Sequence, residues 1–254
     1  MAVLHALEQG PRSLGRVARE VSLTKPTVHR LLGSLSHRQL VIQDPATGDY
    51  MLGPGSIGVA DAAMRGAAGL GVFLTPALER LRDATGETAA LYVRAGLDRV
   101  CIGQAPSSQP VRYTAHVGAA YPLHVGSMGK LLLAFSEETE RADLLQRLEL
   151  RPVTTGTIVD RRRLEADLLR IRRSGVATSR GERAAGVASM SAPVLASDGR
   201  VLAAMSIVGP DTRLTDAVMA RLRSPLVSAA RDVTRQIARR DRTWSVVGPR
   251  VPAK

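Results

Sequence analysis

Four side chains near the N-terminus have the chemistry to contact a nucleic acid: Lys25, Thr27, His29 and Arg30. An arginine can donate two hydrogen bonds to the edge of one guanine, and lysine or threonine can reach a base or a phosphate. The amino end of a helix also favours a phosphate, because its first backbone N–H groups have no acceptor within the helix. These residue types therefore suit contact with DNA if one helix presents them together.

The residues around this group predict such a helix. Its apolar residues recur at intervals of three and four and form one face that we expect to be buried: Val28, Leu31, Leu32 and Leu35. Thr24 is suited to cap the amino end, and Pro26 lies in the first turn, where a missing N–H costs little. Ser34 falls with the basic residues on the opposite face. The alternative is a small helical bundle whose polar face is only solvated.

Two helices are predicted before this one and a β-hairpin after it. Val3, Leu4 and Leu7 mark the first helix, and Ser13 is suited to cap the second. Apolar runs at 40–43 and 49–52 flank a turn with Pro and Gly, which predicts a hairpin. This order predicts a winged helix-turn-helix over residues 1–53, with the third helix in the major groove of DNA. The candidate DNA-binding residues are Ser13, Thr24, Lys25, Thr27, His29, Arg30, Ser34 and Thr47.

The rest of the chain has the pattern of a second domain. Residues 54–74 predict a linker helix rich in Ala and Gly, and residues 242–254 are a polar tail. Between them, strands are predicted at 89–93, 99–104, 111–117, 176–179, 187–195 and 201–208, and helices at 76–86, 127–135, 137–148, 161–174 and 214–240. Strands linked mostly by hairpins, with the helices grouped apart, predict an α+β fold with an antiparallel sheet over residues 75–241.

Patterns typical of catalysis or of a metal site are missing from the sequence. The segment GSMGK at 126–130 looks like part of a phosphate-binding loop, but that motif requires other residues where His124 and Leu131 stand. Cys101 is the single cysteine, and neither His116 nor His124 belongs to a set of ligands, so we expect no metal and no cofactor. One cysteine suits a reducing cytoplasm, and no apolar run is long enough to span a membrane.

The chain of 254 residues is strongly basic, with 35 Lys and Arg, 23 Asp and Glu and a net charge of +12. Such a balance favours a polyanionic partner. The excess is uneven, because residues 1–53 have six basic and four acidic side chains, whereas residues 161–183 have eight and three and residues 221–254 have nine and two. DNA binding is therefore inferred from the placement of Lys25, Thr27 and Arg30, not from the total charge.

Several segments resemble the IclR family of bacterial transcription regulators, in order and with the expected spacing. They are residues 23–32 (LTKPTVHRLL), 50–53 (YMLG), 76–78 (PAL), 86–89 (GETA), 122–124 (PLH), 129–130 (GK), 175–182 (GVATSRGE), 186–187 (GV), 191–194 (SAPV) and 206–210 (SIVGP). The resemblance implies a winged helix-turn-helix joined to a GAF-like domain that binds a small organic ligand. It also implies homodimers or tetramers that bind palindromic or tandem operators in double-stranded DNA.

The same resemblance implies an effector-binding site in the second domain. The positions that line the family's pocket correspond to Ser127, Met128, Ser179, Ser189, Ser206 and Val208. Some members that bind small keto acids carry Asp, Cys and Ser where this chain has Ser179, Ser189 and Val208. Hydroxyl groups beside a methionine and a valine are expected to suit a larger, partly apolar acid. The alternative for each serine is a structural hydroxyl bonded to its own backbone.

These observations predict a cytoplasmic transcription regulator whose operator affinity is controlled by a small organic acid. Two alternatives stay open at this point. One is an enzyme with a GAF-like domain, although the sequence shows no identifiable nucleophile or acid–base pair. The other is a basic protein that binds DNA without sequence preference, and such a protein would bind random and operator DNA equally.

Overall fold

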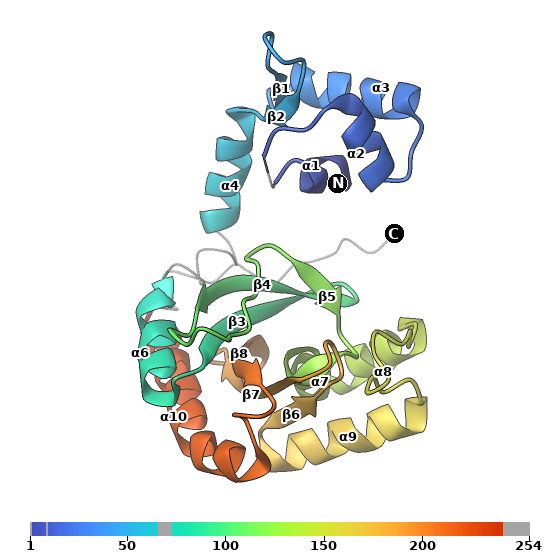
Figure 1. Ribbon diagram of the computed structural model, residues 1–254. Coiled ribbons are helices and arrows are strands. Elements are labelled where there is room, and N and C mark those ends of the chain that lie inside the picture. The colour runs from blue at the N-terminus through green and yellow to red at the C-terminus, as the bar shows by residue number, and fades with distance from the viewer. Residues whose placement is uncertain (1, 9, 66–72, 241–254) are drawn as a thin grey trace. The chain divides into compact units, whose positions relative to one another are not determined.

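The computed structural model describes residues 2–8, 10–65 and 73–240, and the chain divides into two compact units, residues 1–66 and 67–254. In the N-terminal unit the elements are α1 (Ala2–Ala6), α2 (Leu14–Glu20), α3 (Lys25–His37), β1 (Val41–Gln43), β2 (Tyr50–Leu52) and α4 (Gly55–Arg65) (Figure 1). The strands β1 and β2 are antiparallel, with Val41 opposite Leu52. Three helices followed by a hairpin is the predicted order, which the structure confirms.

The first three helices enclose a small core. Val17 of α2 and Val28 and Leu32 of α3 are fully buried, as the helical spacing predicts. The prediction for Leu31 was wrong, because 41% of this residue is exposed. Leu31 lies at the border of the apolar stripe, whereas Leu35, nearer to its middle, packs against the core.

The amino ends of α2 and α3 are capped differently. Ser13 is the N-cap of α2, and its hydroxyl accepts a hydrogen bond from the backbone N–H of Arg16 at 3.4 Å, as predicted. Thr24 occupies the N-cap position of α3 but forms no cap hydrogen bond with its side chain. Its hydroxyl is instead 2.9 Å from the hydroxyl of Thr27. Pro26 lies in the first turn of α3, as expected.

The C-terminal unit is built on a six-stranded sheet. Its elements are α6 (Thr75–Thr85), β3 (Thr88–Ala95), β4 (Asp98–Ala105), β5 (Ala120–Pro122), α7 (Gly126–Phe135), α8 (Glu138–Arg147), α9 (Arg161–Ser174), β6 (Ala177–Arg180), β7 (Val187–Leu195), β8 (Val201–Pro210) and α10 (Asp216–Arg240). The strand order is β5-β4-β3-β8-β7-β6, and every neighbouring pair is antiparallel. The predicted α+β class with an antiparallel sheet is therefore confirmed.

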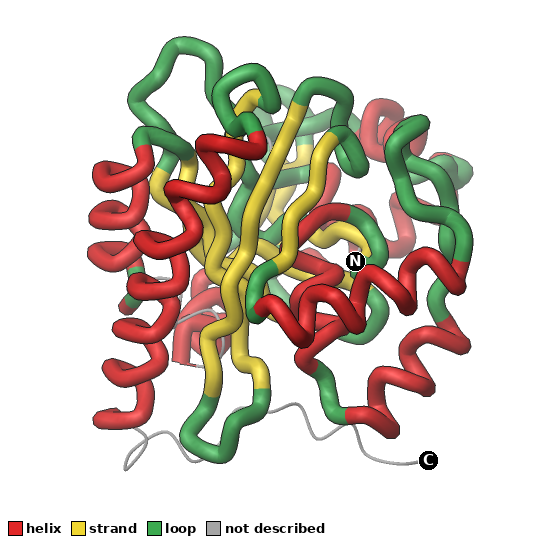
Figure 2. The backbone as a smooth tube through the Cα atoms, turned by 90° about the horizontal axis from the view of Figure 1, so that it is seen from below, coloured by secondary structure: helices red, strands yellow, loops and turns green. Residues whose placement is uncertain are grey.

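Helices cover both faces of this sheet (Figure 2). On one face α6 and α10 pack against residues such as Leu91 and Met205. On the other face α7 packs on β6, β7 and β8, and α8 and α9 pack on α7. Because successive residues of a strand point to opposite faces, Ala90 and Tyr92 of β3 lie on the α7 face. Burial on both faces explains why the central strands are apolar almost throughout.

One predicted strand was wrong. Residues 111–117 belong to a loop that leaves β4 and returns as β5, so the short strand begins at Ala120. Side chains of the sheet provide hydrogen bonds to this loop. The hydroxyl of Thr88 donates to the carbonyl of Tyr113 at 2.6 Å, and the side-chain oxygen of Gln104 accepts from the N–H of Ala115 at 3.0 Å. These two backbone groups of the loop are therefore paired without a strand partner.

Part of the predicted domain layout lies outside the described residues. The linker helix predicted at 54–74 is present as α4 as far as Arg65, whereas residues 66–72 and the tail at 242–254 are not described. The boundaries proposed at 1–53, 54–74, 75–241 and 242–254 stay predictions. Within residues 2–8, 10–65 and 73–240, none of the helices is both long and apolar enough to cross a membrane.

Candidate functional site

The polar face of α3 presents three basic side chains that have no partner among the described residues. Lys25, His29 and Arg30 are exposed, and their side chains form no hydrogen bond or ion pair among the described residues. Ser34 is exposed on the same face, and its hydroxyl donates to the carbonyl of Arg30 at 3.1 Å. The three basic side chains therefore remain available to an outside acceptor.

The other predicted DNA-binding residues already have structural contacts. Thr27 is half-buried against Thr24, and the hydroxyl of Ser13 caps α2. In the hairpin turn, the hydroxyl of Thr47 donates to Asp44 at 3.0 Å and accepts from the N–H of Asp49 at 3.2 Å. Thr47 is exposed, so it shapes the turn and still faces solvent.

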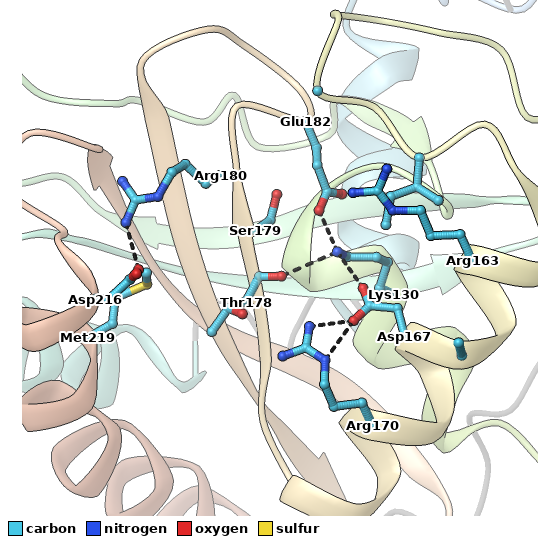
Figure 3. Close-up of a pocket in the computed structure, with 13 residues that line it drawn as sticks. Lys130, Arg163, Asp167, Arg170, Thr178, Ser179, Arg180, Glu182, Asp216 and Met219 are labelled. Atoms are coloured by element: carbon cyan, nitrogen blue, oxygen red, sulfur yellow. Dashed lines mark hydrogen bonds and ion pairs between the residues drawn. The ribbon is translucent and has the colours of Figure 1, made fainter.

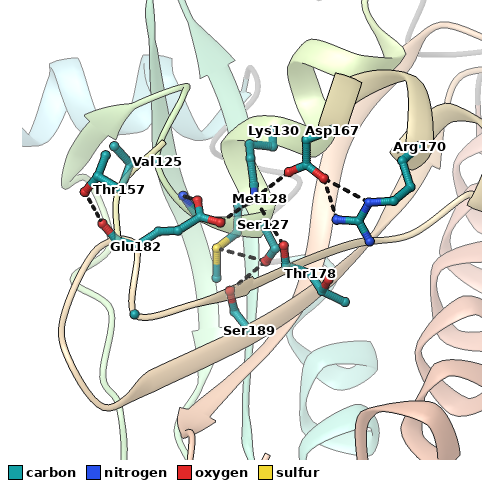
Figure 4. A network of polar contacts seen from close by, with 12 residues as sticks. Val125, Ser127, Met128, Lys130, Thr157, Asp167, Arg170, Thr178, Glu182 and Ser189 are labelled. Carbon is teal, nitrogen blue, oxygen red and sulfur yellow. Dashed lines mark hydrogen bonds and ion pairs between the residues drawn. The ribbon is translucent and has the colours of Figure 1, made fainter. Parts of the chain in front are cut away.

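Four serine hydroxyls form a buried row beneath α7 in the C-terminal unit. The hydroxyl of Ser127 on α7 lies 2.7 Å from that of Ser189 and 2.7 Å from that of Ser191, both on β7. The hydroxyl of Ser191 lies 2.7 Å from that of Ser206 on β8. We call Ser189, Ser127, Ser191 and Ser206 the hydroxyl row; Figure 4 shows the bond between Ser127 and Ser189. These serines are bonded to one another and not to their own backbone.

The remaining predicted effector residues surround this row. The sulfur of Met128 is 3.7 Å from the hydroxyl of Ser127, and Met128 is buried. Ser189 on β7 lies between two of these residues, because it is paired with Val208 on β8 and with Ser179 on β6. All six predicted residues therefore gather at the contact of α7 with β6, β7 and β8. Apolar atoms at Met128 and Val208 adjoin a row of polar hydroxyls, which suits an amphipathic ligand.

Two glycines allow α7 to begin close to the row. Gly126 has a φ of +80°, a backbone conformation that other residues rarely adopt, and its N–H donates to the carboxylate of Glu182 at 2.9 Å. A Cβ at Gly129 would lie 2.2 Å from the carbonyl oxygen of Leu123, so only glycine fits at this approach of helix and loop.

A buried ion-pair network holds the same helix against β6 and α9. The Lys130 ammonium is 2.8 Å from a carboxylate oxygen of Asp167, donates to the carbonyl of Thr178 at 3.2 Å, and also pairs with Glu182 (Figure 4). Burial raises the pKa of Asp167, but Lys130 and then Arg170 more than offset this effect, so that the pKa lies below its ordinary value of 3.8. Lys130 is thus engaged inside the protein and not available to a nucleotide phosphate.

A polar cavity of about 450 Å³ opens beside this network (Figure 3). Ser179, Lys130 and Glu182 line it together with the guanidinium groups of Arg170 and Arg180. Both guanidinium groups are paired with carboxylates, Arg170 with Asp167 and Arg180 with Asp216 at 3.0 Å. Among the predicted effector residues, the lining includes Ser179 alone, and the four serines of the hydroxyl row do not line this cavity.

Two residues near the row were missed by the sequence analysis. Ser191 is two residues after Ser189 in a predicted strand, so alternation of the strand faces would have placed it beside Ser189. Arg99 is fully buried on β4, and no sequence signal indicates this, because a charged residue in a strand is ordinarily exposed. Within the described part of the chain, the structure contains no group of three or more His, Cys, Asp or Glu able to hold a metal ion.

Two family models match the chain. The IclR helix-turn-helix domain matches residues 1–45, and the bacterial transcriptional regulator IclR C-terminal domain matches residues 69–235. The HTH-type transcriptional regulator BhcR of Paracoccus denitrificans is 31% identical over 222 residues, which are 87% of this chain and 79% of BhcR. The HTH-type transcriptional repressor AllR of Escherichia coli K12 is 31% identical over 236 residues, which are 92% of this chain and 87% of AllR.

Solved structures are similar over nearly the whole chain. A transcriptional regulator from Rhodococcus sp. RHA1 has a TM-score of 0.77 at 27% identity, covering 94% of this chain and 96% of its own. An IclR homolog from Microbacterium hydrocarbonoxydans, complexed with 4-hydroxybenzoate, has a TM-score of 0.72 at 22% identity, with coverage of 92% and 97%. The second likeness is one of fold.

Proposed function

The chain belongs to the IclR family of bacterial transcriptional regulators, and on that premise we propose that a small organic acid, bound in the C-terminal unit, controls its affinity for a specific operator. Its relatives are named regulators and repressors, and the chain is accordingly a transcriptional regulator and not an enzyme. Membership of the family does not identify the residues of this chain that contact DNA or the ligand that it binds, and both are proposed below.

The exposed polar face of α3 is the observation that carries the DNA-binding proposal. Lys25 and Arg30 have no partner among the described residues, so their charges are free to meet phosphates and base edges. Arg30 lies in the first half of the helix, where recognition helices contact bases. Ser13 and Thr47 are exposed at neighbouring turns and are proposed to contact the DNA backbone.

The hydroxyl row supports the proposal of an organic acid as effector. Buried hydroxyls that bond to one another, and in Ser127 also to the sulfur of Met128, can exchange one of these bonds for a bond to a ligand. The amino end of α7 carries partial positive charge, part of which the carboxylate of Glu182 meets through the Gly126 N–H, and the remainder favours an anionic group on that ligand. The ligand of the Microbacterium protein is an acid with an apolar ring, and the apolar atoms of Met128 and Val208 suit a body of that kind.

A homodimer or tetramer is part of the same proposal, because paired winged helices bind two half-sites. Ile57 and Val59 of α4 are 71% and 61% exposed, which supports a contact of this helix with a second copy. Ligand binding beneath α7 would then change how two recognition helices fit two half-sites. Coupling of this kind between two sites is typically about 1–3 kcal/mol.

Selection of duplexes from a random pool, followed by gel shifts at several salt concentrations, tests the DNA-binding part. We expect one enriched sequence that binds far more tightly than random DNA. Arg30→Ala should weaken binding to that sequence by about 1–3 kcal/mol. Arg172→Ala, which removes an exposed arginine from α9, is the matched control and should leave the affinity unchanged.

Two results would contradict the proposal. Equal affinity for selected and random DNA would instead support a basic protein that binds without sequence preference. An unchanged affinity in Arg30→Ala would show that α3 does not read the operator through this residue. Adding organic acids to the same gel shift tests control by an effector, since at least one acid should alter operator binding.

A further inference from the structure

A buried arginine in the C-terminal unit has no carboxylate partner among the described residues. Arg99 on β4 is 1% exposed, and none of the recorded ion pairs includes it. Its Nη1 donates to the carbonyl oxygens of Pro122 at 2.8 Å and Val125 at 2.5 Å. These neutral oxygens accept its hydrogens but supply no full negative charge. Buried charges in proteins are usually paired with an opposite charge. Arg99 is an exception, because no counter-ion is present among the described residues.

The edge of Arg99 that remains free is the edge that binds carboxylates. Its Nε is buried and has no hydrogen-bond partner within the described chain. The rings of Tyr92 and Tyr121 lie over the guanidinium, with their centres 5.5 Å and 5.2 Å from its Cζ. The tyrosine rings cover the face of the guanidinium, and Nη1 is hydrogen-bonded to backbone carbonyls. The Nε and Nη2 groups remain, and together they can donate two parallel hydrogen bonds to a carboxylate.

A second guanidinium adds to the uncompensated charge. The Cζ of Arg183 is 3.9 Å from the ring centre of Tyr121 and 5.4 Å from that of Tyr113, whose hydroxyl it also contacts. Burial raises the pKa of both Tyr92 and Tyr113, so these phenols stay neutral and supply no negative charge. Burial lowers the pKa of Arg99, yet a guanidinium stays protonated at neutral pH.

This charged cluster adjoins the hydroxyl row. A Cβ on Gly126 would lie 3.5 Å from Nη2 of Arg99, and Ser127 of the row is the next residue. Tyr92 and Ser206 lie on the same sheet face, because the residue paired with Ser206 on β3 is two positions before Tyr92. The free edge of the guanidinium, the amino end of α7 and the row therefore meet in one region.

We propose that Arg99 binds the carboxylate of the effector. The inference rests on the proposed function, since it names the residue and the ligand class of the same regulatory site. The carboxylate accepts from Nε and Nη2 of Arg99, and a second polar group, where the effector has one, bonds to the hydroxyl row. The carbon body contacts Met128 and Val208. The ligand is thus a carboxylic acid with an apolar body, and a neutral molecule of the same shape leaves Arg99 without its counter-ion.

Acids and amides of the same shape distinguish this role from mere packing. The probes are benzoate with benzamide and hexanoate with hexanamide, and their Kd values are measured by calorimetry on the full chain. Wild-type protein should bind at least one acid about tenfold or more tightly than its amide. Arg112→Gln is the control, because Arg112 is exposed and donates only to the carbonyl of Gln109 at 3.2 Å. It should keep the preference, whereas Arg99→Gln should bring the ratio close to one.

The ratio compares two ligands on one variant, so a general loss of stability does not imitate the expected result. If Arg99→Gln does not fold, Arg99→Lys keeps the charge without the paired N–H edge and should lower the ratio several-fold. Equal wild-type affinity for acid and amide, no binding of either acid, or an unchanged ratio in the Arg99 variant would overturn the proposal. Operator binding by the same ligand-free preparations tests the regulator function separately, so specific DNA binding without acid preference rejects only the role of Arg99.

Discussion

The Lys130 ammonium joins three elements of the C-terminal unit, and replacing it with methionine tests how much this junction contributes to stability. The side chain of Lys130 is 2% exposed, and those of its partners Asp167 and Glu182 are 10% and 7% exposed. Lys130→Met keeps an unbranched side chain one atom shorter and removes the charge. Two carboxylates are then left in a buried site with fewer partners.

The expected loss is about 3–5 kcal/mol, the usual cost of removing one member of a buried ion pair. Two contacts limit it, because Asp167 keeps Arg170 and Glu182 keeps the N–H of Gly126 at 2.9 Å. Protonation of the Asp167 carboxylate sets a further upper limit on the loss of stability. With an ordinary pKa of 3.8 for Asp167, protonating that carboxylate at pH 7 costs about 4 kcal/mol.

Hydrogen–deuterium exchange with mass spectrometry measures this loss within the C-terminal unit, because peptides from α7, β6 and α9 are followed separately. The matched control is Arg170→Met. Arg170 pairs with the same Asp167, but its side chain is 64% exposed, so its removal should cost about 0–1 kcal/mol. A loss below about 1 kcal/mol for Lys130→Met, or one equal to the control, would refute the view that this buried network stabilises the fold.

Two further predictions concern the helix caps and the response to acid. Ser13→Ala should destabilise α2 by about 0.5–1 kcal/mol, because its cap hydrogen bond is long, and Thr24→Ala should cost α3 less, because no cap bond is present. Exchange of α2 and α3 peptides checks the order, and the reverse order would contradict this account. The pKa of Asp167 is lowered, so its stabilising effect is present above its ordinary value of 3.8 and is lost as the pH falls through the folded-state pKa. In the wild type, the urea concentration at the unfolding midpoint of the C-terminal unit should fall as the pH drops below 3.8. Asp167→Asn should make this fall less steep, and an unchanged slope would contradict the stabilising role given to the Asp167 carboxylate.

The parts of the fold that local patterns determine were predictable. The α3 helix follows from the spacing of Val28 and Leu32 and from Pro26 in its first turn. Most strands follow from apolar runs that end at turns, such as the turn between β3 and β4 at Gly96. These signals act within a few residues, so the sequence alone carries them.

The errors arise where distant residues decide the outcome. Val111 and Val117 suggested a strand, but they are 69% and 59% exposed, and Thr88 and Gln104 hold the loop between them from the sheet. Leu31 has the spacing of a core residue and lies at the edge of the core.

The candidate site shows the same division. The six candidate effector positions were implied by the resemblance to the IclR family and stay predictions, whereas the burial of Arg99 depends on two tyrosines that only the folded chain brings to it.

The hydroxyl row has a property that its heavy atoms do not reveal. Its four hydroxyls share three hydrogen bonds, and in each bond either oxygen can be the donor. Rotation about the Cβ–Oγ bonds therefore reverses the polarity of the whole row while every oxygen stays in place. If a ligand contacts the row as proposed, the same end can meet a ligand that donates or one that accepts, since the ligand itself sets the direction. Under the proposed function, the row itself would therefore need no new polar groups to meet a different effector.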